Sequence, residues 1–244
     1  MTRLSLWRVS VRYKNIHEGL FLERMHRFGA IVEIEGHTEY VHVKNTGRCR
    51  EILVPGTRVF LEKKLGEERK TRYSLISALR GNLLINIDSQ VPNTVVHEAI
   101  TNHQISEFKD ITYLKREKSY GKSRFDLYFE RDNGSRGFIE IKGVTLDSEG
   151  KAMFPDAPTK RGLKHLNELS YAKAEGYESY VIFLVQYSPV RFFTPNQKTD
   201  PDFAEGLKNA VKSGVIAMAF DSHVNEDSIS LGTGVEIRLN QGIS

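Results

Sequence analysis

The sequence has a single cysteine, Cys49, among its 244 residues, and this scarcity excludes two kinds of site. One thiol cannot form an internal disulfide, and it cannot build a zinc site made of cysteines. A chain with so little cysteine is typical of a reducing compartment, so the expected location is the cytoplasm. Cys49 itself is expected to behave as a small buried hydrophobe.

Long apolar segments are also missing. The first fifteen residues carry scattered charges and lack the apolar stretch of a secretion signal. No uninterrupted apolar run approaches the ~20 residues that a membrane-spanning helix needs, so we expect no membrane partner. The hydrophobic fraction of 39% is nevertheless ample for a folded core.

The motifs of several small-molecule enzymes are absent. The chain has no Gly-rich dinucleotide loop, no Walker A sequence and no nucleophile elbow. These absences argue against an enzyme that uses a dinucleotide, a nucleoside triphosphate or an activated serine. The sequence leaves the oligomeric state open.

Charge is present but unevenly distributed. Residues 1–82 carry 16 lysine and arginine residues against 9 aspartate and glutamate residues, a net charge of +7, whereas residues 83–244 have a net charge of −3. A basic N-terminal part indicates a module that faces a polyanion such as nucleic acid. The alternative is ordinary surface charge with a chance asymmetry.

The spacing of apolar residues predicts two domains. Several short strand-like segments divided by glycines and turns lie before residue 82, which is typical of a small β-barrel, and an oligonucleotide-binding (OB) barrel is the usual kind at this size. Over residues 83–244 helices alternate with buried strands, as in an α/β domain. A helix is expected after Pro92 and Asn93 with Thr94 as its N-cap, and another over 159–176, with a loop at 149–158 between them.

Three charged residues lie in an otherwise apolar β-hairpin of the second domain. Asp126 and Glu140 fall on two strands joined by a short turn, and Lys142 shares a strand face with Glu140. Two neighbouring carboxylates repel each other unless a cation lies between them, and Mg²⁺ or Mn²⁺ favours such oxygen ligands. The carbonyl of Ile141 could add a third oxygen. Lys142 could then orient or deprotonate an attacking water, which is the chemistry of phosphodiester hydrolysis.

A purely structural interpretation of these charges stays open. In that interpretation Asp126 and Lys142 form an ion pair between the strands, and Glu140 faces solvent. The apolar surroundings FDLYF and FIEIKGV favour a functional site, because a solvated strand face normally shows polar neighbours.

Basic residues at two places could contact nucleic acid. Lys160, Arg161, Lys164 and His165 fall at the start of the helix expected over 159–176, where a phosphate could bind, although a solvated basic face is the alternative. In the barrel, Arg24 and Arg27 lie near aromatic residues, as in surfaces that stack single strands, although most of those rings are expected in the core. Gln186, at the end of a buried strand, could point into the carboxylate site, but a hydrogen-bonded strand end is the favoured interpretation.

The arrangement of an aspartate, then Glu-x-Lys, on adjacent strands after a helical Glu98 resembles the PD-(D/E)xK nuclease superfamily. More specifically, the chain resembles the sugar fermentation stimulation protein A family. The stretches that carry this resemblance span nearly the whole chain: NTGRCREILVPGTRVFLEK, PNTVVHEAI, SRFDLYF, FIEIKGVTL and FPDAPTKRGLKHLNEL. One departure is Phe125, which stands where the superfamily name has proline.

The resemblance implies an OB-like domain, a restriction-endonuclease-like domain and DNA binding. It implies that Asp126 and Glu140 are metal ligands, that Lys142 is the catalytic lysine and that Glu98 is a further acid. It also implies a regulatory role in sugar utilisation. Two hypotheses follow: a DNA-binding protein with a divalent-metal-dependent nuclease site, or a non-catalytic DNA-binding regulator that retains the nuclease-like fold.

Overall fold

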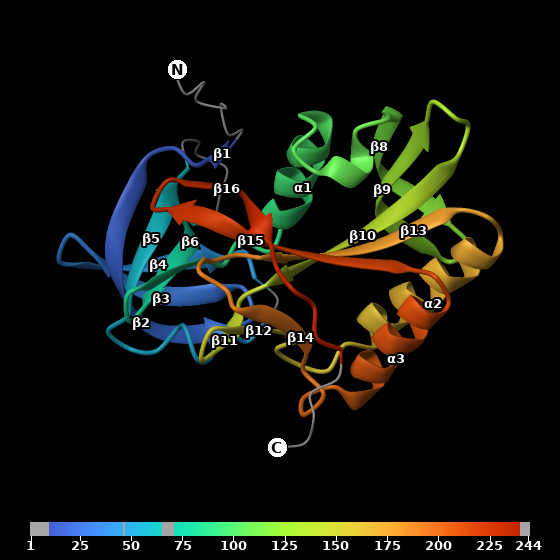
Figure 1. Ribbon diagram of the computed structural model, residues 1–244. Coiled ribbons are helices and arrows are strands. Elements are labelled where there is room, and N and C mark those ends of the chain that lie inside the picture. The colour runs from blue at the N-terminus through green and yellow to red at the C-terminus, as the bar shows by residue number, and fades with distance from the viewer. Residues whose placement is uncertain (1–9, 46, 65–70, 240–244) are drawn as a thin grey trace, which may run out of the picture.

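The computed structural model describes residues 10–45, 47–64 and 71–239, which form two domains side by side (Figure 1). Strands from the N-terminal third make a barrel on the left of the view. A mixed sheet with helices on both faces extends to the right. The described residues contain no helix with the length and apolar character needed to cross a bilayer.

The barrel is a six-stranded sheet in the order β4-β3-β2-β5-β6-β7, which an extra pairing of β4 with β6 closes. Its strands are β2 (Ile16–His26), β3 (Gly29–Ile34), β4 (His37–Val43), β5 (Arg58–Lys63), β6 (Tyr73–Arg80) and β7 (Leu83–Asn86). Alternate apolar side chains point inward and are fully buried, among them Val32, Val41 and Leu75. Gly19 lets β2 approach β3, because a Cβ there would lie 2.7 Å from the Glu33 carbonyl. The expected barrel is confirmed.

The second domain is built on a seven-stranded sheet in the order β1-β16-β15-β13-β10-β9-β8, in which β10, β13 and β15 run parallel. Its strands are β1 (Val11–Arg12), β8 (Ile111–Tyr120), β9 (Ser123–Arg131), β10 (Arg136–Val144), β13 (Glu178–Val185), β15 (Ile216–Asn225) and β16 (Ser228–Gly234). Both faces of β13 are covered. One set of its alternate residues packs with α2 (Lys160–Ala174) and α3 (Pro201–Lys212), and the other set packs with α1 (Val91–Thr101). This is the predicted α/β arrangement.

A three-stranded sheet corrects the expected loop at 149–158. The strands β11 (Leu146–Ser148), β12 (Lys151–Phe154) and β14 (Phe192–Pro195) pair in that order. The pairing of β12 with β14 is parallel and joins segments far apart in the chain. The pairing of β11 with β12 is a local hairpin, whereas local sequence patterns do not indicate the pairing with β14.

The first helix begins earlier than expected. Helix α1 starts at Val91 with Gln90 as its N-cap residue, so Thr94 lies inside the helix rather than at its cap. Pro92 is compatible with the first turn, because the N–H that it lacks would have no partner within the helix there. The shift places Asn93 in the first turn, where it faces the second-domain sheet.

Buried polar contacts join the two domains. Gln186, at the end of β13, donates from Nε2 to the backbone carbonyls of Asn86 and Asp88 at 3.1 and 3.0 Å. Lys44 of the barrel forms an ion pair with Asp88 at 3.0 Å.

The domain division predicted after residue 82 separates β7 from β6, its partner in the barrel sheet. Conversely, β1 precedes the barrel in the chain but belongs to the sheet of the second domain, where it pairs with β16.

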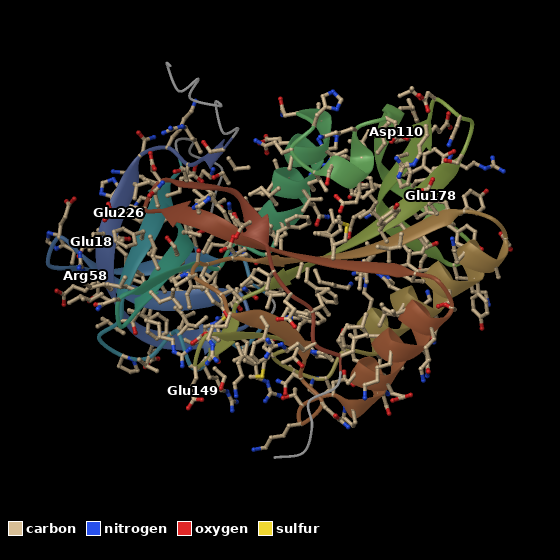
Figure 2. The ribbon with its side chains drawn as sticks, viewed as in Figure 1. Glu18, Arg58, Asp110, Glu149, Glu178 and Glu226 are labelled. Carbon is tan, nitrogen blue, oxygen red and sulfur yellow. The ribbon has the colours of Figure 1, made fainter. Side chains whose placement is uncertain are left out.

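The far end of the second-domain sheet is held by an ion-pair cluster. Arg131 donates to both carboxylate oxygens of Glu178 at 2.8 Å and also contacts Asp110, and Figure 2 shows both acids at this end of the molecule. Arg131 lies over the rings of Phe108 and Phe129. A buried guanidinium with two carboxylates and aromatic neighbours is fully compensated.

Candidate active site and nucleic-acid interface

The centre of the site is the point where the hairpin of β9 and β10 opens. The two strands pair up to Leu127 and Ile139, and Asp126 and Glu140 are the next residues. There the backbone N–H of Ile141 donates to Asp126 Oδ2 at 2.7 Å. The hairpin therefore brings both carboxylates to the place where its backbone pairing ends and holds one of them with a backbone donor.

Glu140 is the most buried charged group of this centre, with a residue exposure of 2%. Its Oε1 atom accepts from Lys142 Nζ at 2.6 Å and from His165 Nδ1, whereas Oε2 is buried without a hydrogen-bond partner among the described residues. Burial raises the pKa of Glu140, but the positive charge of Lys142 and the contact with His165 outweigh it. The resulting pKa lies below its ordinary value.

These contacts contradict the structural interpretation in which Asp126 pairs with Lys142 and Glu140 faces solvent. Lys142 pairs with Glu140, and among the described residues no ion pair joins Lys142 to Asp126. The reason is the strand period: residues two apart share a face, so Glu140 and Lys142 project together into the same interior space.

Asp126 is held by two donors. Besides the Ile141 N–H, Asn93 donates from Nδ2 to Asp126 Oδ1 at 2.7 Å. Burial, followed by the negative charge of Glu140, raises the pKa of Asp126 above its ordinary value. Asn93 was not singled out as a site residue in the sequence, because its contact with Asp126 depends on where α1 packs against the sheet.

Glu98 lies on α1 with its Oε2 atom buried and without a hydrogen-bond partner in the described part of the chain. Burial raises the pKa of Glu98, and Arg116 on β8 opposes that effect. No hydrogen bond that the structure describes joins Glu98 to Asp126 or Glu140. Glu98 is thus a second carboxylate with unused bonding capacity, positioned by the same helix as Asn93.

The start of α2 brings one of its expected residues into the centre. Thr159 caps the helix by accepting from the Gly162 N–H at 3.0 Å. His165 is buried with an exposure of 4%, and its two ring nitrogens contact different partners: Nδ1 meets Glu140, and Nε2 lies 3.4 Å from Arg161 Nε. His165 therefore lies in the interior, whereas the other three residues of the predicted phosphate site, Lys160, Arg161 and Lys164, are exposed.

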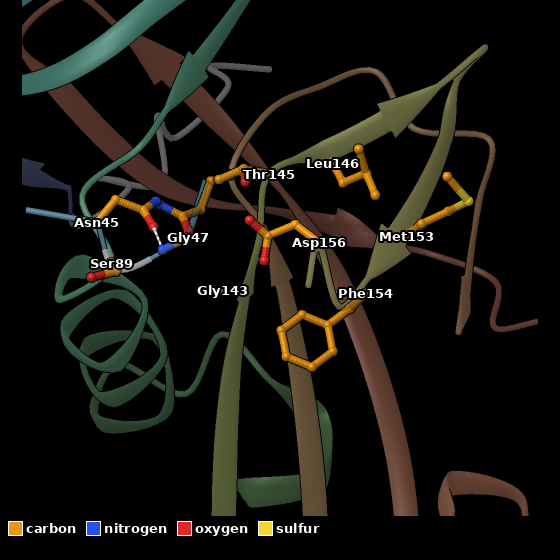
Figure 3. A pocket seen from close by; sticks show the side chains of 10 residues that line it. Asn45, Gly47, Ser89, Gly143, Thr145, Leu146, Met153, Phe154 and Asp156 are labelled. Atoms are coloured by element: carbon orange, nitrogen blue, oxygen red, sulfur yellow. Dashed lines mark hydrogen bonds between the residues drawn. The ribbon is translucent and has the colours of Figure 1, made fainter. Parts of the chain in front are cut away.

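A small pocket lies between the end of β10 and a loop of the barrel. It encloses about 130 Å³, and Figure 3 shows Phe154 and Asp156 on one side and the loop at Asn45 and Gly47 on the other. Gly143, the neighbour of Lys142 in β10, lines it too. We call it the junction pocket. Gln186 also lines it but uses its amide on Asn86 and Asp88, which fits the hydrogen-bonded strand end rather than a direct role in the carboxylate centre.

The barrel presents a basic and aromatic surface next to the junction pocket. Phe28 and Tyr40 are 44% and 42% exposed. The expectation that most of these rings lie in the core is therefore wrong for these two. The guanidinium of Arg27 lies over the Phe28 ring, 5.4 Å from its centroid. Arg24 donates to backbone carbonyls, including that of Asn45 at 3.0 Å. Exposed rings beside cations form the type of surface on which bases stack.

Two family models match the chain. The SfsA N-terminal OB domain matches residues 22–87, and the sugar fermentation stimulation protein RE domain matches residues 90–228. The closed barrel and the mixed sheet agree with this pairing. The chain is thus an OB domain followed by a restriction-endonuclease-like domain.

Relatives extend the match over nearly the full length. A sugar fermentation stimulation protein homolog of Desulfitobacterium hafniense is 51% identical over 95% of this chain and 100% of its own length, and a homolog of Clostridium botulinum is 50% identical over 93% of this chain and 98% of its own. The solved structure of SfsA from Pyrococcus furiosus in complex with Ca²⁺ has a TM-score of 0.86 and 29% identity, covering 93% of this chain and 98% of that one. The chain belongs to the sugar fermentation stimulation protein family.

Proposed function

We propose that the protein is a divalent-metal-dependent phosphodiesterase that acts on nucleic acid, with DNA as its substrate. The observation that carries this proposal is the Oε2 atom of Glu140, which is buried without a partner among the described residues in a centre it shares with Asp126. A buried carboxylate oxygen that lacks a partner is costly, and a cation between the two carboxylates would satisfy it. The two side chains therefore fit a hard cation such as Mg²⁺ or Mn²⁺.

The proposed metal ligands are Asp126, Glu140 and the carbonyl of Ile141, with Glu98 as a further acid. Within the described residues no three His, Cys, Asp or Glu side chains are grouped to hold a metal, so Glu98 stands apart from the pair Asp126 and Glu140. The proposed site therefore relies on two carboxylates completed by water and substrate oxygens, as Mg²⁺ sites commonly do. The Ca²⁺ in the Pyrococcus furiosus relative supports a cation site in the family. When bound, the metal would polarise the phosphodiester and help to activate water.

The remaining polar groups position the reacting ones. Lys142 is the proposed catalytic lysine, because its ammonium lies beside Glu140 and can orient an attacking water or neutralise a phosphate oxygen. His165 and Asn93 restrain the carboxylates of Glu140 and Asp126. Restrained carboxylates need little reorganisation when a cation and substrate bind.

The proposed contacts with the nucleic-acid backbone come from both domains. Lys160, Arg161 and Lys164 are exposed at the start of α2, next to the carboxylate centre through His165. Arg24 and Arg27 belong to the barrel surface that carries the exposed Phe28 ring. Basic side chains in both domains support a nucleic-acid strand that contacts the barrel and the second domain together.

A non-catalytic DNA-binding regulator is the second candidate. Glu140 Oε1 already has two donors, and each oxygen of Asp126 has one. A largely satisfied set of hydrogen bonds can hold the fold without a metal. In this case the basic surfaces would bind DNA, and the carboxylates would serve stability.

Cleavage of labelled single- and double-stranded DNA, with and without Mg²⁺ or Mn²⁺, separates the candidates. We expect metal-dependent cleavage by the natural protein and none by Glu140→Gln, which keeps an acceptor for His165 but loses the charge. Glu205→Gln on α3 is the matched control, because Glu205 is exposed and far from the hairpin in the chain. A natural protein that binds DNA but cuts neither form with either metal would leave the regulator.

A further inference from the structure

Four arginines of the barrel surround one cavity of about 480 Å³. They come from two segments: Arg24 and Arg27 from β2 and the turn after it, and Arg48 and Arg50 from the loop between β4 and β5. We call this cavity the arginine pocket. His26, Gly47 and Leu53 complete its wall.

The arginine pocket has no counter-charge of its own. Among the residues that the structure describes, none of its four arginines forms an ion pair, although most barrel carboxylates have a basic partner. Two acids lie nearby without pairing with these arginines: Asp156 accepts from the backbone N–H of Arg48 at 3.1 Å, and one oxygen of Glu51 is buried without a hydrogen-bond partner among the described residues. Four cations around one cavity repel each other, and an anion would remove that cost.

Arg24 is the fixed member of the group. Its Nε and Nη2 atoms donate to the carbonyls of His26, Arg27 and Asn45 at 3.1, 2.5 and 3.0 Å. Its Nη1 atom is buried and has no partner in the described chain. Burial lowers the pKa of its guanidinium, which means that the folded protein stabilises this cation poorly. Arg24 is therefore a rigidly held cation in the wall of the pocket, and it contributes positive charge there while the other three arginines can supply donors to an anion.

The shape of the pocket favours a terminal phosphate over the internal phosphates of a strand. Internal phosphates each carry one negative charge and are spread along a backbone, whereas a terminal phosphate carries nearly two charges and three oxygens at one point. The four arginines line a single cavity, so their positive charge is concentrated in one place. The exposed Phe28 ring beside Arg27 offers a stacking surface for the adjoining base.

We infer that the arginine pocket binds the terminal phosphate of a nucleic-acid strand and so measures the strand from its end. This inference rests on the proposed function. Gly47 lines both the arginine pocket and the junction pocket, and Gly143 of the junction pocket is the neighbour of Lys142. The two pockets therefore share a wall at Gly47, and the junction pocket reaches β10 on its other side. No side chain fits at residue 47, since a Cβ there would lie 2.5 Å from Asp156 Oδ2.

The test is a binding measurement that does not depend on cleavage. Fluorescently labelled single strands of one sequence carry a 5′-phosphate, a 3′-phosphate or only hydroxyl ends, and anisotropy is recorded in EDTA with the full chain. We expect one of the phosphorylated strands to bind roughly tenfold more tightly than the hydroxyl strand, the effect of one charge-assisted hydrogen bond. Arg50→Ala should remove that preference and retain the weaker binding. Arg58→Ala is the matched control, since Arg58 is an exposed barrel arginine already paired with Glu18.

Competition separates a strand end from a free anion. Inorganic phosphate at millimolar concentration should reduce the preference for the phosphorylated strand only partly, because the strand adds stacking and backbone contacts. Equal affinity for all three strands would overturn the inference. So would complete loss of the preference when the concentration of inorganic phosphate equals the dissociation constant of the phosphorylated strand. Cleavage that continues while the end preference is absent would refute the arginine pocket alone, whereas an end preference in a protein that never cuts would refute the phosphodiesterase alone.

Discussion

The two domains treat arginine in opposite ways. In the nuclease-like sheet the side chain of Arg131 is 8% exposed and has carboxylate partners in Glu178 and Asp110. In the barrel Arg24 donates only to backbone carbonyls and forms no ion pair with any residue that the structure describes. The charge of Arg131 is neutralised by carboxylates of the same folded chain, and these ion pairs hold strands together. Arg24 has no carboxylate partner among the described residues, and we propose that its charge serves an external anion.

Carboxylates repeat the contrast within a single domain. Glu178 bonds to Arg131 with both of its oxygens, and its pKa lies below the ordinary value. Glu140 is more deeply buried, yet one of its oxygens has no partner in the described chain. We propose that the difference separates a charge that stabilises the sheet from a charge that is positioned for a ligand. Mutations at the two kinds of residue should therefore have different consequences.

Lys142→Ala should produce the largest effect and test the binding side of this contrast. If Lys142 acts on the attacking water, cleavage should fall by roughly 10²–10⁴-fold while DNA affinity changes little, because one cation is lost among many phosphate contacts. A melting curve and a cleavage assay on the same preparation measure both properties. A loss of stability of about 3–5 kcal/mol with binding lost only through unfolding would mark the lysine as structural.

Arg131→Ala should be the most destabilising of the arginine substitutions. It removes the cation between Glu178 and Asp110 together with its contacts to two aromatic rings. We expect a loss of about 3 kcal/mol in the free energy of unfolding, measured by urea denaturation. Arg24→Ala should cost less, because it relieves repulsion within the arginine pocket. Equal losses at the two positions would contradict the contrast between the domains.

Metal binding should have a smaller effect on stability. Mg²⁺ or Mn²⁺ at about a hundred times its dissociation constant should stabilise the natural protein by ~2.7 kcal/mol, since only the folded chain assembles the ligands. The double variant Asp126→Asn with Glu140→Gln should show no metal-induced shift in melting temperature. A shift of the same size in the double variant would locate the cation elsewhere.

The sequence predicted the hairpin of the centre because its determinants are local. Alternation with period two places Glu140 and Lys142 on one face, and the Asp-Asn-Gly turn returns the chain beside Asp126. The burial of His165 had a local signal as well: it lies four residues before Leu169 on the apolar stripe of α2, and both are buried. That signal was outweighed by the neighbouring basic residues.

The parts that the sequence did not predict depend on contacts between distant segments. Asn93 reaches Asp126 only because α1 packs on the sheet next to the hairpin. Strand β12 pairs with its neighbour β11, and also with β14, which lies about 40 residues later in the chain. Arg48 and Arg50 were not singled out, since a basic loop gains meaning only when it folds beside Arg24. Such juxtapositions are set by tertiary packing, which local periodicity does not encode.

The smallest expected effect concerns pH and sharpens the contrast between compensated and exposed ion pairs. Burial raises the pKa of Glu178, but the hydrogen bonds from Arg131, Ser135 and Tyr180 outweigh it, so the folded pKa lies below the ordinary value of 4.5. A lowered carboxyl pKa contributes stability that is present above pH 4.5 and is lost as the pH falls through the folded pKa.

Glu178→Gln should therefore flatten the dependence of unfolding free energy on pH below about pH 4.5, by no more than ~1 kcal/mol, because the side chain is partly solvated. Glu18→Gln in the barrel is the matched control. Its pKa is also lowered by Arg58, yet both side chains of that pair are half exposed, on the left of Figure 2. Solvent screens such a pair, so its removal should leave the pH dependence unchanged. An equal flattening in both variants would show that burial does not distinguish the two ion pairs.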